Sequence, residues 1–222
     1  MKITILTLFP EMIEPIINSS ILKRAQQNQL VDFDIVNFRE FSTNKHMTVD
    51  DTPYGGGSGM VLAVEPIYLA LESIKDKGHK ILLSPQGKKF NQNIAKSFLK
   101  EEHLIFVCGH YEGFDERVRE FVDEELSLGD FVMTGGELAA LAMIDSIVRM
   151  IPGVLGSKES FEKDSFYEDF LDFPQYTKPR EFKGLHVPEV LLSGNHAQIE
   201  KWRKEMQIKR TKERRPDLMK DQ

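Results

Sequence analysis

Continuous apolar runs recur along the first two thirds of the chain, each bounded by polar or turn residues. Runs of this kind are typical of strands buried in a parallel sheet. A further strand is predicted where Val31, Phe33 and Ile35 alternate with aspartates, as in a strand that is half buried. The apolar runs lie at residues 3–9, 80–83, 104–108 and 126–128.

Helical periodicity fills the intervals between these strands. Residues 11–27 carry apolar side chains at helical spacing, and Pro15 is compatible with this helix only in its first turn. Further helices are predicted from Val64, over 91–100 and over 136–150. Strands separated by helices of about ten or more residues predict an α/β domain with a mainly parallel sheet.

Two stretches lack periodicity. Residues 40–60 form a loop too long for a simple connection, and such loops are usually functional or disordered. After Pro152 the pattern is lost again, which predicts a linker or flexible lid, and a small helical segment follows from Pro188. The chain of 222 residues is long enough for one substantial core and a smaller appendage.

Charge is distributed unevenly between these parts. The net charge is −6, but residues 201–215 carry eight basic side chains and two glutamates, so this tail is +6 and the rest of the chain is −12. A basic helical tail on an acidic body is typical of a contact with a phosphate backbone. From charge alone, the alternative is a solvated helix face with Trp202 packed on the core.

The rest of the composition narrows the class of protein. Cys108 is the only cysteine and lies in an apolar run, so we expect a buried small side chain, and a reducing cytoplasm fits. Pro10 and Glu11 end the first apolar run, without the cleavage pattern of a signal peptide. The helix at 136–150 contains three charged residues, so no membrane span is expected.

Glycine-bearing turns follow three of the predicted strands, at Ser84–Gly87, Gly109–Gly113 and Ser127–Gly136. In open α/β sheets ligands bind beyond the carboxyl ends of the strands, although ordinary turn glycines are the alternative reading. GxGxxG and GxxxxGK[ST] do not occur, which removes the main support for a dinucleotide dehydrogenase or a P-loop nucleotidase. The histidines lack zinc-ligand spacing, and Asp50 with Asp51 lacks further oxygen ligands, so no metal site is predicted.

Longer motifs carry a resemblance to a known family. They run through nearly the whole chain, and motifs of this length in this order are highly specific. With them the chain resembles the bacterial tRNA (guanine-N1)-methyltransferases, the TrmD family of the SPOUT superfamily. The motifs are LFPEM at 8–12, TVDDTPYGGGSGM at 48–60, LSPQGKK at 83–89, VCGHYEGFDERV at 107–118, SLGDFVMTGGEL at 127–138, IDSIVRMIPGVLG at 144–156, KDSF at 163–166, PQYTKP at 174–179 and LLSGNHAQIEKWR at 191–203.

The resemblance implies features that periodicity does not reveal. It implies a deep trefoil knot near the C-terminal half of the α/β domain that binds S-adenosylmethionine in a bent form, and an obligate homodimer with active sites at the interface. The implied substrate is the tRNA anticodon stem-loop, methylated at N1 of the guanine immediately 3′ of the anticodon when a guanine precedes it. The expected parts are a knotted domain at 1–156, a lid at 157–172 and a small basic, helical tRNA-binding domain at 173–222.

The family motifs also assign roles to individual residues. Arg149 matches the catalytic arginine and Asp164 the proposed general base. On the substrate side we expect Glu112, His110, where the family often has arginine, and Asp50. The tail residues expected to contact tRNA are Lys209, Arg210, Arg214 and Arg215. The implied donor pocket comprises Leu83, Ser84, Pro85, Gly109, Tyr111, Gly113, Ser127, Leu128, Gly129, Met133, Gly135 and Gly136.

The implied reaction moves an electrophilic sulfonium methyl to guanine N1. Positioning of guanine N1 in line with the methyl group should contribute most to the rate enhancement, together with removal of the N1 proton by Asp164. Because a carboxylate is a weak base for this proton, we expect Arg149, alone or with Mg²⁺, to stabilise the negative charge that develops on O6. The base must also leave its stack, which suits a lid. Two alternatives stay open: an enzyme of this superfamily acting on another RNA, and a non-catalytic RNA-binding module.

Overall fold

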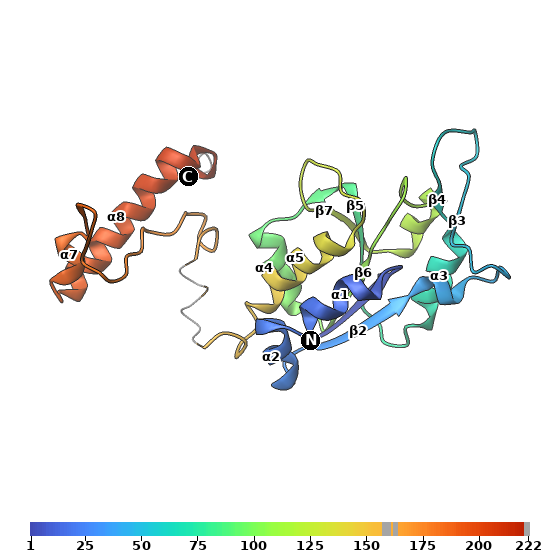
Figure 1. Ribbon diagram of the computed structural model, residues 1–222, viewed down its shortest axis with the longest axis horizontal. Coiled ribbons are helices and arrows are strands. Elements are labelled where there is room, and N and C mark those ends of the chain that lie inside the picture. The colour runs from blue at the N-terminus through green and yellow to red at the C-terminus, as the bar shows by residue number, and fades with distance from the viewer. Residues whose placement is uncertain (157–160, 162–163, 220–222) are drawn as a thin grey trace. The chain divides into compact units, whose positions relative to one another are not determined.

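A five-stranded parallel sheet forms the frame of the first part of the chain (Figure 1). The computed structural model describes residues 1–156, 161 and 164–219, and the chain divides into two compact units, Met1–Gly156 and Ser157–Gln222. Every pair of neighbouring strands in the sheet is parallel, so the predicted α/β fold is confirmed. In spatial order the strands are β2 (Asp32–Asn37), β1 (Lys2–Thr7), β6 (His103–Val107), β5 (His79–Lys89) and β7 (Glu124–Ser127).

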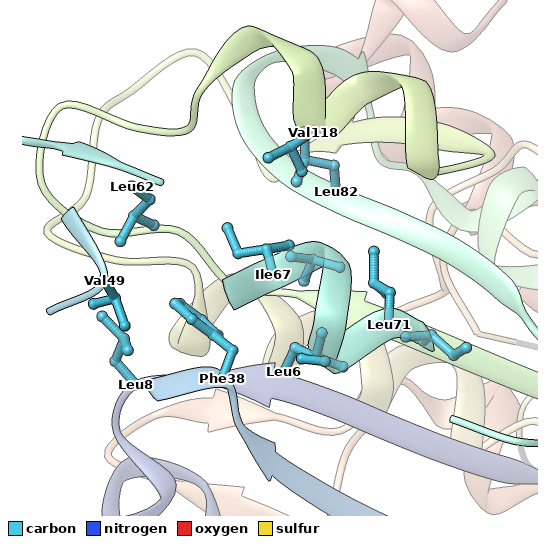
Figure 2. Packing of buried hydrophobic residues seen from close by; sticks show 12 residues of the cluster. Leu6, Leu8, Phe38, Val49, Leu62, Ile67, Leu71, Leu82 and Val118 are labelled. Carbon is cyan, nitrogen blue, oxygen red and sulfur yellow. The ribbon is translucent and has the colours of Figure 1, made fainter. Parts of the chain in front are cut away.

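Both faces of the sheet are buried. Leu6, Val107 and Leu82 lie opposite one another on the three central strands, and they pack with Ile67 of α3 (Val64–Ser73) in one apolar cluster (Figure 2). The side chains one position earlier in each strand point to the opposite face and are also fully buried. Continuous apolar runs in the sequence follow directly from this burial on both sides.

Helix α5 (Glu137–Val148) lies in the layer on the other face. It contacts three further helices, and eight of its twelve residues are buried, which explains why its sequence is apolar almost all round. Its neighbours are α1 (Pro10–Ile17), α2 (Ser20–Gln27) and α4 (Gln92–Ser97), the last continued by a 3₁₀ turn, η2 (Phe98–Lys100).

The single helix predicted over 11–27 is two helices, α1 and α2, in the structure. Two side chains bond to the last carbonyl groups of α1: Asn18 Nδ2 donates to Glu14 O (2.9 Å) and Ser19 Oγ donates to Ile16 O (2.8 Å). Short polar side chains compete with the helical backbone in this way. Pro15 lies inside α1 and beyond its first turn, because α1 already begins at Pro10.

Strand β5 is longer than predicted because its chain loops out and then rejoins β7. Leu83 and Lys88 both lie opposite Leu126, so residues 84–87 leave the ladder. Pro85 cannot donate a ladder hydrogen bond, and a Cβ on Gly87 would fall 2.5 Å from the backbone carbon of Glu125. The SPQG motif therefore makes a bulge between β5 and β7.

The aperiodic segment 40–60 is anchored at both ends. A 3₁₀ helix, η1 (Phe38–Phe41), leads into it, and the short antiparallel strands β3 (Asp50–Asp51) and β4 (Val61–Leu62) bracket its glycine-rich tip. Val49 and Leu62 are fully buried in the cluster of Figure 2. The tip between the strands is exposed, whereas its base belongs to the core.

The second unit is small and its longest element is one helix. A two-stranded antiparallel hairpin, which periodicity had not indicated, precedes the helices. The elements are β8 (Glu181–Phe182), β9 (Leu185–His186), α7 (Glu189–Leu192), α8 (His196–Arg214) and the 3₁₀ turn η4 (Pro216–Met219).

Truncation of Ile67 tests the packing in Figure 2. Ile67→Ala should lower the free energy of unfolding of the first unit by about 2–5 kcal/mol, and Ile67→Val by about 0.5–1.5 kcal/mol. Alanine has the higher helix propensity, so the reverse order in urea denaturation followed by circular dichroism would show that local propensity, and not burial, controls this position.

Candidate functional site

Three loops surround one cavity of about 320 Å³: the bulge within β5 and the two segments that follow β6 and β7. This volume lies within the range of small-molecule pockets. The lining includes all twelve residues that the family motifs assign to the donor pocket, namely Leu83, Ser84, Pro85, Gly109, Tyr111, Gly113, Ser127, Leu128, Gly129, Met133, Gly135 and Gly136. Residues 53 positions apart in sequence therefore meet at one edge of the sheet.

Glycines let the backbone of these loops approach the cavity and one another closely. Gly113 has φ +108°, a conformation that a side chain would strain, and Tyr111 beside it has φ +60°. Gly136 N–H donates to Gly109 O (2.9 Å), and a Cβ on Gly136 would fall 2.9 Å from Cys108 Cα. The second and third loops are thus joined backbone to backbone.

A buried carboxylate fixes the position of the second loop. Glu137 is fully buried at the start of α5; Thr7 Oγ1 donates to its Oε1 (2.6 Å), and His110 Nε2 lies 2.7 Å from its Oε2. The start of a helix favours a negative charge, and both carboxylate oxygens are bonded, as a buried charge requires. The ring of His110 also lies 4.5 Å from that of Phe9. His110 is therefore held as part of the wall of the cavity.

The same burial makes Cys108 chemically quiet. Its side chain is fully buried, and desolvation, with a smaller contribution from the Glu137 carboxylate, raises the pKa of the thiol well above its usual range. The expectation of a buried small side chain is confirmed.

Arg119, on the 3₁₀ helix η3 (Glu116–Phe121), ties the first loop to strand β7. Its guanidinium donates to both carboxylate oxygens of Glu125 on β7 (2.9 and 3.1 Å) and to Gln86 Oε1 (3.1 Å), and it pairs with Glu116. These carboxylates, with the bond to Glu125 first, raise the pKa of the arginine. Arg119, Thr7 and Glu137 are not among the site residues predicted from the sequence, although the charged DERVREF run after a strand is a usable signal for Arg119.

Of the predicted substrate residues Glu112 and Asp50, only Glu112 lies at the cavity. Glu112 lines the cavity, and its backbone N–H donates to Met60 O (3.0 Å) at the end of the glycine-rich segment. A Cβ on Gly59 would fall 2.7 Å from Glu112 Cδ, so this glycine makes room for the side chain. Asp50 pairs with Leu62 in the β3–β4 ladder and does not line the cavity.

Arg149 lies at the far end of α5 from the cavity. The helix begins at Glu137, next to Gly136 of the cavity wall, and Arg149 follows its last residue. Twelve helical residues span about 18 Å. The arginine and the cavity of one chain are therefore well separated.

Asp164 belongs to the second unit, where it lines a cleft of about 490 Å³ with residues of α8, among them Lys201, Arg203 and Lys204. Of the predicted tRNA contacts, Lys209, Arg214 and Arg215 are exposed and Arg210 is partly buried. The predicted lid at 157–172 includes residues 157–160 and 162–163, which lie outside the described residues.

Two kinds of feature are absent from the described residues. No group of three histidine, cysteine, aspartate or glutamate side chains is gathered as a metal would require in residues 1–156, 161 and 164–219. Over the same residues, no helix combines the length and apolar character needed to cross a bilayer.

Taken together, the parallel sheet and the loop cavity define an α/β protein of the class that binds a small ligand at the carboxyl ends of its strands. The sequence matches the family described as tRNA (Guanine-1)-methyltransferase TrmD over residues 1–221. The chain belongs to this family.

Individual relatives agree with this assignment. A tRNA (guanine-N(1)-)-methyltransferase of Bacillus subtilis is 57% identical over 226 aligned residues, covering 100% of this chain and 93% of the relative. Enzymes of the same name from Desulforamulus reducens and Staphylococcus epidermidis are 56% and 55% identical, covering 100% and 99% of this chain and 89% and 91% of theirs. The resemblance in the motifs thus extends along the whole chain.

Gly135→Ala tests the contact between the second and third loops. A Cβ here would fall 2.6 Å from Glu137 Oε2 and closer still to His110 Nε2, so the pair must separate or the loop must shift. We expect a loss of about 1–3 kcal/mol in the free energy of unfolding. Gly156→Ala is the matched control, because its Cβ would meet nothing within 4 Å. Equal stability of the two variants would contradict the tight packing described.

Proposed function

We propose that the chain transfers a methyl group from S-adenosylmethionine to N1 of the guanine immediately 3′ of the anticodon, in tRNAs where a guanine precedes it. The observation that carries the proposal is the single cavity around which all twelve donor residues of the family motifs meet. Membership of the family supports the reaction class, and the names of the relatives support tRNA guanine N1 as the acceptor.

The cavity suits a donor with both polar and apolar parts. Its wall combines backbone groups of the glycine loops with apolar side chains such as Leu83, Leu126 and Met133. S-Adenosylmethionine supplies an electrophilic methyl when bound. The loops hold this donor, and Glu112, which lines the same cavity, contacts donor or guanine.

Removal of the N1 proton is assigned to Asp164. A carboxylate is a weak base for this proton, so the reaction needs a second group that lowers the cost of charge developing on the guanine ring. The guanidinium of Arg149 serves this purpose at O6, where a fixed positive charge stabilises the transition state more than the ground state. Positioning of N1 in line with the methyl group contributes the rest.

A second copy of the chain completes the site in this proposal. Arg149 lies about 18 Å along α5 from its own cavity, too far to reach a base bound there. Large apolar side chains are exposed near the cavity: Val132 at 83%, Phe131 at 56% and Leu138 at 53%. Exposed apolar side chains grouped in this way are typical of an interface. A homodimer would cover them and bring the partner's arginine to the cavity.

The family resemblance also implied a trefoil knot and a role for Mg²⁺. We propose that the three loops belong to a deep trefoil knot, supported by the backbone bond that joins Gly136 to Gly109 deep in the unit. Mg²⁺ prefers several oxygen ligands, and the described residues gather no such group. No step is therefore assigned to the ion.

Substitution of the two reacting residues tests the proposal. Asp164→Asn and Arg149→Ala should each slow single-turnover methylation by about 10²-fold or more, because proton removal and charge stabilisation typically contribute 10²–10⁴-fold. Glu168→Gln, the same change in the same cleft, should keep the wild-type rate. The substrate is an unmodified tRNA with guanine at both positions, and the product is mapped to the modified atom.

Near-normal rates in both variants would reject the assigned roles. A tRNA in which the preceding guanine is replaced serves as the substrate control, and we expect it to be methylated poorly. Methylation of another nucleotide, or of a ribose hydroxyl, would instead identify an enzyme of this superfamily with a different RNA substrate. Absence of transfer from labelled S-adenosylmethionine would favour a non-catalytic RNA-binding module.

A further inference from the structure

The segment that carries Asp164 is bonded to the basic helix α8. Leu171 N–H donates to Thr211 Oγ1 (2.9 Å), and the Thr211 hydroxyl donates in turn to Gln207 O (2.8 Å) one turn earlier in the helix. Thr211 is the one residue of α8 that is completely buried. The buried hydroxyl of Thr211 therefore accepts a hydrogen bond from a residue outside the otherwise polar helix α8.

Basic residues of α8 hold the same segment. Arg210 Nη1 donates to Asp172 O (3.4 Å), and the Arg203 guanidinium lies over the Phe173 ring at 4.8 Å. Arg215, just after the helix, lies 5.4 Å from the Phe166 ring and is paired with Asp217. Cation–π contacts of this geometry are attractive. Two of the four cations predicted to contact tRNA thus have partners inside their own unit.

Hydrogen bonds within the segment connect the residues held by α8 to Asp164. Tyr167 N–H donates to Asp164 O (3.2 Å), Phe166 N–H donates to Phe170 O (2.7 Å), and Asp172 N–H donates to Ser165 Oγ (2.9 Å). Residues 164–172 therefore form a compact loop whose ends are tied together, and Leu171 of that loop is tied to the helix.

Two exposed lysines of α8, Lys209 and Lys212, lie on a different face of the helix. Arg203, Gln207 and Thr211 are four residues apart and share the face toward the segment. Lys209 and Lys212 are exposed, and the helical period turns them well away from that face. One face of α8 is thus occupied by the loop of Asp164, while the other presents positive charge to solvent.

We infer that Thr211 is a positioning residue for Asp164, and that α8 couples tRNA docking to placement of this carboxylate. The exposed lysines contact tRNA phosphates, and the Thr211 hydroxyl keeps the loop of Asp164 fixed to the docked helix. Binding of the RNA then orients helix and loop as one body. This inference rests on the proposed function, since it takes Asp164 to be the base.

Thr211→Val and Thr211→Ser separate this role from a structural one. Valine keeps the volume of threonine and removes the acceptor of Leu171 N–H, whereas serine keeps the hydroxyl. At saturating tRNA and S-adenosylmethionine, single-turnover methylation by Thr211→Val should fall about tenfold, the effect of one lost buried hydrogen bond. The tRNA dissociation constant should stay within about twofold. Thr211→Ser should retain the wild-type rate.

Hydrogen exchange measured by mass spectrometry reports on the loop directly. Peptides covering 164–173 should exchange faster in Thr211→Val than in Thr211→Ser or the wild type. Ser165→Ala removes the acceptor of Asp172 N–H within the loop and should produce the same loss of rate without loss of affinity, even if Thr211→Val does not fold. Lys209→Ala with Lys212→Ala should weaken tRNA binding and flatten its salt dependence.

The inference is overturned if Thr211→Val and Ser165→Ala methylate at the wild-type rate, or if their defect lies wholly in tRNA affinity. An equal defect in Thr211→Ser would also overturn it. Asp164→Asn, assayed in parallel, keeps the two proposals apart: a slow Asp164→Asn with a normal Thr211→Val rejects the positioning role alone, whereas a normal Asp164→Asn rejects the base assignment itself.

Discussion

The buried carboxylate of Glu137 is the constraint on which the cavity depends. A buried charge needs hydrogen-bond partners, and the bonds of Glu137 bring the end of β1, the loop after β6 and the start of α5 together. Thr7 and His110 supply the bonds. Gly135 must lack a side chain because these groups occupy the space beside it. The rigid wall that results is the prerequisite for holding a small ligand through backbone groups, since such contacts have value only when the loops do not move.

The cavity lies at one end of α5, and Arg149, the proposed catalytic arginine, lies at the other end. The same helix that fixes the cavity also fixes the distance of Arg149 from it, so flexibility within the first unit cannot bring the two together. The proposed homodimer would resolve this separation, and the exposed apolar side chains beside the cavity would provide a surface for it. Asp164, the proposed general base, belongs to the other unit of the chain, where α8 holds its loop. Catalysis would thus require three positioned parts, of which only the donor cavity is complete in one unit.

Most strands of the parallel sheet, and the cavity beside them, could be predicted from the sequence. Apolar runs identified the strands because burial on both faces leaves few polar positions, and the glycine turns identified the cavity because they follow those strands. Pairings between distant side chains could not be predicted: Thr7 and Glu137 are 130 residues apart, and neither lies in a periodic pattern that relates them. The break between α1 and α2 depends on Asn18 and Ser19 bonding to nearby carbonyl groups, which periodicity does not report. The roles of Asp164 and Arg149 stay predictions of the family motifs.

In the proposed homodimer, one chain supplies the donor cavity and its partner supplies Arg149. Mixing two inactive variants tests it most directly: Gly113→Val, which places a side chain at φ +108° in the cavity wall, and Arg149→Ala. After the subunits are exchanged, half of the dimers should be mixed, and each mixed dimer should hold one intact site. We expect recovery of about a quarter of the wild-type methylation of tRNA. No recovery, with mixed dimers demonstrated by mass, would contradict it, because it would show that cavity and arginine act within the same chain.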